Sequence, residues 1–161
     1  MPLRWIIFKI ICLLQITGTT LLGGYSLINF IRWPGFGSFA SVVVNAMGML
    51  LAVLGMQLLH RNYPDIPVAG KQKSTFNKLF VINFLLLSFY FGFIFSEYKL
   101  LKNIAQLLGT AVWDIPFRLQ LPLFGNTVLL TFQLCILYGL FVLRRELYRN
   151  FTEKSFDFES R

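Results

Sequence analysis

Residues 39–59 have the sequence FASVVVNAMGMLLAVLGMQLL, a stretch that contains no charged side chain. At the helical rise of about 1.5 Å per residue, a helix of this length is about 30 Å long, which matches the hydrocarbon core of a bilayer. A soluble domain would instead alternate apolar and polar residues with the period of a strand or of a helix. The segment therefore predicts a membrane-spanning helix.

Three further apolar runs of similar length flank this segment. They cover residues 9–31, 76–96 and 124–143. The first is joined to 39–59 by a short link that contains Pro34, Gly35 and Gly37, so we expect these two helices to form an antiparallel hairpin. The predicted fold class is an all-α integral membrane protein, a four-transmembrane-helix bundle in which residues 1–161 form one membrane domain and residues 144–161 a cytoplasmic tail.

The basic residues predict the orientation. The chain carries 15 Lys and Arg against 7 Asp and Glu. Four basic residues, Arg32, Lys99, Lys102 and Arg118, fall on one side of the predicted bundle, and the other eleven fall on the opposite side. Positively charged loops remain in the cytoplasm, so both termini are expected there, in a bacterial inner membrane or another plasma membrane. Because the charges cluster at the ends of the apolar runs, nucleic-acid binding is not expected.

The segment between the third and fourth runs has its own pattern. Between residues 99 and 113, apolar side chains recur at helical spacing with Lys99, Lys102, Asn103 and Gln106 largely between them. This pattern predicts a short amphipathic helix that lies on the outer membrane surface. Pro116 and Pro122 then predict an extended or turned connection before the fourth helix. The apolar face of the amphipathic helix comprises Leu100, Leu101, Ile104, Leu107, Leu108 and Trp113.

Small residues form a stripe along one face of the 39–59 helix. The stripe has spacings of four, three, four and three residues and consists of Ser41, Asn45, Gly48, Ala52 and Gly55. Helices in lipid associate where such small residues allow their backbones to approach closely. The first helix has a comparable stripe of Gln15, Thr19, Gly23 and Ser26. We expect the two stripes to pack together within the hairpin; the alternative is that the 39–59 stripe binds a second subunit.

Several amides lie within or near the apolar runs, and they include Gln15, Asn29, Asn83 and Gln133. An amide without a hydrogen-bond partner is costly in hydrocarbon, so we expect these side chains to face the bundle interior and to bond across helices. A polar lining of a permeation path is the alternative. The two differ in whether the amides converge on one another or on a hydrated path.

Groups that would support catalysis are scarce. His60 is the only histidine, Cys12 and Cys135 lie in separate apolar runs, and Glu97 and Asp114 lie at or beyond the outer ends of the runs. Metal sites, proton relays and thiol pairs each need a combination that these residues do not provide. We therefore expect no catalytic residue, no metal site and no cofactor.

Contact surface is what the sequence offers for function. The principal hypothesis is a non-catalytic membrane subunit or scaffold that associates through its helix faces with membrane lipid or with a partner membrane protein. The alternative is a small pore or carrier, formed as a homo-oligomer and lined by amide and by Ser, Thr and Gly residues.

Overall fold

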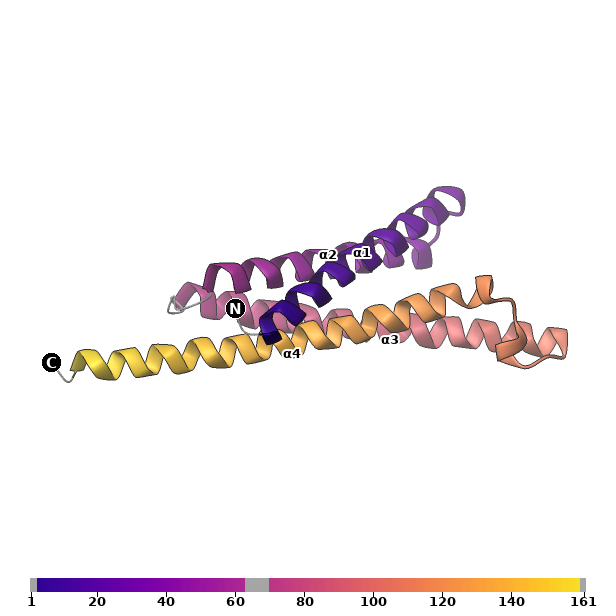
Figure 1. The fold of residues 1–161 in the computed structure, drawn as a ribbon. Coiled ribbons are helices and arrows are strands. Elements are labelled where there is room, and N and C mark those ends of the chain that lie inside the picture. The colour runs from indigo at the N-terminus through magenta and orange to yellow at the C-terminus, as the bar shows by residue number, and fades with distance from the viewer. Residues whose placement is uncertain (1–2, 63–69, 160–161) are drawn as a thin grey trace.

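The computed structural model describes residues 3–62 and 70–159, which form four long helices and one short 3₁₀ turn (Figure 1). The long helices are α1 (Leu3–Arg32), α2 (Phe36–Asn62), α3 (Gly70–Leu108) and α4 (Phe117–Glu159), and the turn η1 covers Val112–Asp114. The prediction of an all-helical chain with four long apolar helices is confirmed. The last two residues of the predicted tail lie outside the described part of the chain, and the rest of the tail continues α4.

All four long helices contain a segment that is long and apolar enough to cross a membrane. These segments are Leu3–Arg32, Phe36–His60, Ser74–Leu108 and Phe117–Glu146. Each is longer than the corresponding apolar run, because flanking polar turns continue the helix beyond the apolar stretch.

The helices pair as two hairpins, α1 with α2 and α3 with α4, which pack together mainly through α1 and α4. We call the end of the bundle where each hairpin turns the far end, and the opposite end, which carries both termini, the terminal end. Towards the far end the α1–α2 hairpin is inclined away from the α3–α4 hairpin, and α3 and α4 extend past it (Figure 1). At the terminal end α4 extends past the other helices.

The predicted amphipathic helix is not a separate element, because residues 99–108 are the last turns of α3. With 39 residues, α3 is about 58 Å long, roughly twice the hydrocarbon thickness of a bilayer. It ends where Gly109 adopts a left-handed conformation with φ of 67°. The amides of Gly109 and Thr110 there donate to the carbonyls of Gln106 and Ala105, the pattern of a Schellman cap.

The extended connection predicted up to Pro122 is shorter in the structure, since α4 begins at Phe117 and contains Pro122. A proline within a helix removes one amide donor and crowds the carbonyl four residues earlier. The side chain of Gln120 connects the first turn of α4 to the preceding segment, because its Nε2 donates to the carbonyl of Ile115 at 2.6 Å.

Two apolar clusters hold the fold together. The larger one runs along the bundle and includes Trp5, Phe8, Leu51, Leu86 and Ile136. The smaller one lies at the far end, where Leu101 and Ala105 of α3 pack against Ile115. The smaller cluster anchors the η1 connection to the projecting end of α3.

Candidate functional site

The small-residue stripe of α2 faces α1 over much of its length. At the far end the hydroxyls of Ser41 and Ser26 are 2.7 Å apart and hydrogen-bonded. A Cβ atom added at Gly23 would lie 3.3 Å from the Cβ of Asn45, so the two helices approach closely there. Towards the terminal end Gly55 lies beside the ring of Phe8. The stripe thus lines the interior of the hairpin.

Three of the predicted amides form a buried chain that joins three helices. Gln15 of α1 donates through Nε2 to Oε1 of Gln133 in α4 at 3.0 Å, and Gln133 donates through Nε2 to Oδ1 of Asn83 in α3. All three side chains are fully buried. The two hydrogen bonds tie the two hairpins together, while Gln15 Oε1 and Asn83 Nδ2 at the ends of the chain are buried without a partner.

A buried tyrosine, which the sequence analysis did not single out, lies beside this amide chain. The side chain of Tyr90 in α3 is fully buried. A Cβ atom added at Gly48 of α2 would lie 2.8 Å from its hydroxyl oxygen and 3.2 Å from the methyl group of Thr19. The missing side chain of Gly48 is thus what admits the Tyr90 hydroxyl between α1 and α2.

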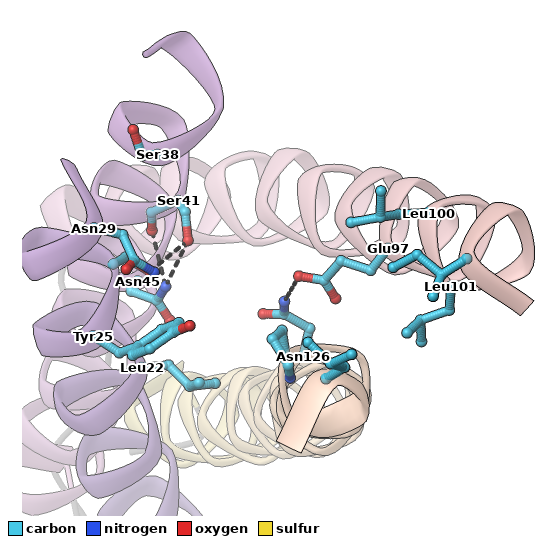
Figure 2. A pocket seen from close by; sticks show the side chains of 14 residues that line it. Leu22, Tyr25, Asn29, Ser38, Ser41, Asn45, Glu97, Leu100, Leu101 and Asn126 are labelled. Carbon is cyan, nitrogen blue, oxygen red and sulfur yellow. Dashed lines mark hydrogen bonds between the residues drawn. The ribbon is translucent and has the colours of Figure 1, made fainter. Parts of the chain in front are cut away.

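A cavity of about 270 Å³ separates the two hairpins towards the far end (Figure 2). Its α1–α2 wall includes Ser26, Asn29, Ser41 and Asn45. The opposite wall combines Glu97 and Asn126 with apolar side chains, namely Leu100, Leu101, Ile104, Leu119 and Pro122. The cavity is therefore mostly apolar with a few polar groups on facing walls, which is the usual composition of a small-molecule site.

The polar groups of the α3–α4 wall are held in place by one hydrogen bond. Asn126 donates through Nδ2 to Oε1 of Glu97 at 2.9 Å (Figure 2). The other carboxylate oxygen, Oε2, is buried and accepts no hydrogen bond. In the described part of the chain, no lysine or arginine forms an ion pair with Glu97.

A second unused acceptor lies on the α1–α2 wall. Asn45 is 2% exposed and donates through Nδ2 to the backbone carbonyl of Ser41 at 2.8 Å. Its Oδ1 is buried and has no hydrogen-bond donor. The Ser41 carbonyl fixes which end of the amide is the donor, so the free atom is the acceptor. Both walls thus present an acceptor without a partner.

Known proteins do not identify this site. Comparisons with protein-family models, with curated proteins and with solved structures give no match to the chain.

The other predicted residues occupy different environments. Asn29 lines the cavity rather than joining the amide chain. Of the predicted amphipathic face, Leu101 is buried against Ile115, and Leu100 and Ile104 line the cavity. Leu107, Leu108 and Trp113 are exposed. The single face predicted from spacing is therefore divided between a small core, the cavity and the outer surface.

Sequence reasoning missed Asn126 and the position of Glu97 in the cavity. Asn126 lies two residues after the predicted start of the fourth run, and Glu97 directly follows the end of the third. The available signal was that both residues lie at the same end of two successive antiparallel helices. Without the register of the two helices, that signal does not predict a hydrogen bond.

A second, larger hollow of about 560 Å³ lies between α1 and α4 near the terminal end. It is lined mainly by apolar residues and by Arg4, whose guanidinium forms an ion pair with Glu146 at 2.7 Å. Its charged group is thus already neutralised, in contrast to Glu97.

No group of three His, Cys, Asp or Glu side chains within residues 3–60 and 74–146, where the structure describes the side chains, is arranged to hold a metal ion. Cys12 is buried, Cys135 is exposed, and both are free thiols.

Proposed function

We propose that the chain is an integral membrane protein that acts by association without a catalytic step of its own, and that it binds an amphiphile in the cavity between its hairpins. The apolar exterior supports the membrane location. Large side chains such as Leu21 of α1 and Phe84 and Phe91 of α3 are about two-thirds exposed, which in water would be an extended apolar surface.

The orientation proposed from the basic residues determines the level of the membrane at which the cavity lies. With the terminal end in the cytoplasm, the far end lies at the outer membrane surface. Glu97 and Asn126 then lie at the outer ends of the two runs 76–96 and 124–143, near the level of the lipid headgroups. An amphiphile could place its polar group beside them and its chain along the apolar wall.

The observation that carries this proposal is the cavity itself, in which a mostly apolar α3–α4 wall faces a mostly polar α1–α2 wall and each wall contains a buried acceptor without a partner. A pore lined by amides gains less support. Gln15, Gln133 and Asn83 are buried and bond one another, which is the arrangement expected of amides that hold helices together.

Photocrosslinking in detergent micelles tests the proposal. A diazirine-labelled C12 alcohol should crosslink to cavity residues of different helices, including Leu22, Ile104 and Leu119, and excess dodecanol should compete with it there. Crosslinks at the outward-facing Phe84 and Phe91 serve as the control, because contact with bulk detergent cannot be saturated. Equal competition at both sets of residues, or no crosslink in the cavity, would contradict the proposal.

A further inference from the structure

We infer that the far-end cavity is selective for an amphiphile with a primary ammonium group, which binds to the free oxygen of Glu97. This inference rests on the proposed function and adds the chemical class of the ligand. Its basis is the kind of polar group that each cavity wall leaves without a partner.

The two unused atoms are both acceptors. Glu97 Oε2 and Asn45 Oδ1 are buried and bond to nothing in the protein. A buried acceptor without a donor destabilises the protein, and does so more when it carries a charge. A ligand that supplies N–H groups would remove this cost, whereas one that supplies only further acceptors would increase it. The cavity therefore favours donors.

The carboxylate adds a requirement for charge. Glu97 has one oxygen bonded to a neutral amide, Asn126, and no ion pair within the described residues. A carboxylate removed from water is stable only beside a cation or when it takes up a proton. An ammonium group provides the cation together with three N–H donors, one of which can bond to Glu97 Oε2. A quaternary ammonium provides the charge without the donors.

The apolar wall indicates that the cation is attached to a hydrocarbon chain. Leu100, Leu101, Ile104, Leu119 and Pro122 line the cavity on the same side as Glu97. A small hydrated amine would leave this surface uncovered, and a chain would cover it. The headgroup of phosphatidylethanolamine and a single-chain alkylamine share this chemistry.

A matched-tail series tests the inference on the full-length protein in detergent. The binding constants of dodecylamine, dodecyltrimethylammonium and dodecanol are measured by calorimetry for the wild type, Glu97→Gln and Asp114→Asn. In the wild type, dodecylamine should bind about tenfold or more tightly than the other two, as expected for a hydrogen bond between charged groups. Glu97→Gln should reduce this preference to about twofold while dodecanol binding is retained.

The two variants distinguish an effect of the Glu97 carboxylate from an effect of the net charge at this end of the bundle. Glutamine keeps an oxygen that can accept from Asn126, so Glu97→Gln should fold. Asp114→Asn removes a negative charge from the same end of the bundle, at an exposed residue outside the cavity, and should keep the preference. Equal loss of preference in both variants would overturn the inference, because it would show attraction to net charge alone.

The other outcomes distinguish this inference from the proposed function. If the three C12 compounds bind equally well to the wild type, the ammonium inference fails and amphiphile binding stands. If none of them binds, the proposed function fails as well. Once the preference is established, phosphatidylcholine nanodiscs with 10 mol% phosphatidylethanolamine identify the source. If phosphatidylethanolamine is enriched around the wild type but not around Glu97→Gln, the ligand is the headgroup of this lipid. If it is not enriched around the wild type, the ligand is a single-chain amine.

Discussion

At the scale of single residues, Gln133 is the middle member of the amide chain. It accepts from Gln15 and donates to Asn83, so that one amide connects α1, α3 and α4. Its loss would remove the acceptor that Gln15 Nε2 has in the structure and the donor that Asn83 Oδ1 has. Each side-chain hydrogen bond between helices in a membrane contributes little to the free energy of unfolding, about 0.6 kcal/mol on average and up to about 1.7 kcal/mol.

We expect Gln133→Leu to destabilise the fold by about 1–2 kcal/mol, because two interhelical bonds are lost together. Gln57→Leu is the matched control, since Gln57 is an exposed amide in α2. The free energy of unfolding is measured by titration with a denaturing detergent. The double variant Gln15→Leu/Gln133→Leu should cost less than the sum of the single changes, since the bond between them is lost only once. Equal stability of Gln133→Leu and Gln57→Leu would show that the amide chain contributes nothing.

At the scale of elements, a close approach between helices depends on Gly48. Its position in the stripe of α2 was predictable from spacing alone. The neighbour that requires a glycine at this position was not predictable, because Tyr90 belongs to α3 and approaches from the opposite hairpin. A pattern within one helix predicts which face is small, but the residue that fills the space depends on how the helices are arranged.

Gly48→Ala should therefore destabilise the bundle by about 1–3 kcal/mol, since the added methyl group overlaps the Tyr90 hydroxyl in a filled interior. Removing that hydroxyl in Gly48→Ala/Tyr90→Phe should recover much of the loss. Gly92→Ala is the control, because nothing lies within 4 Å of a Cβ atom there. Thermal unfolding in detergent measures all three. Failure of Tyr90→Phe to compensate would mean that the methyl group of Thr19, rather than the hydroxyl, sets the limit.

The end of α3 shows where prediction from sequence stops for another reason. The apolar spacing of residues 99–113 predicts a separate helix, whereas in the structure residues 99–108 continue α3. The spacing carries no information on whether a helix continues the preceding one. Continuity depends on the backbone between Phe95 and Lys99, where no proline or glycine interrupts the chain. The break comes instead at Gly109, where the left-handed conformation is accessible at little cost.

At the scale of the whole molecule, the four long helices were predictable because length and hydropathy are properties of each segment by itself. The cavity was not predictable, because it results from the inclination of one hairpin against the other. Asn45 had been placed in the packing stripe, and Glu97 had been placed outside the apolar runs. Only the arrangement of all four helices brings them to facing walls of one cavity.

Orientation in the membrane is also a property of the whole chain. With Cys12 and Cys135 replaced by Ala and Ser, a cysteine at Ser74 should be protected from an impermeant thiol reagent in intact cells. A cysteine at Gln106 should react, since both positions are exposed in the structure and lie at opposite ends of α3. Labelling at Ser74 with protection at Gln106 would place the termini outside the cell.

The amide chain has a consequence for how the protein is made. Gln15 and Gln133 are separated by 118 residues, so the α1–α2 hairpin leaves the ribosome well before its partner in α4 exists. At about 5–20 residues per second, synthesis of the intervening chain takes about 6–24 s. During that interval Gln15 lacks its final partner, so the hairpin that is made first carries an amide whose hydrogen bond to α4 forms only when the last helix arrives.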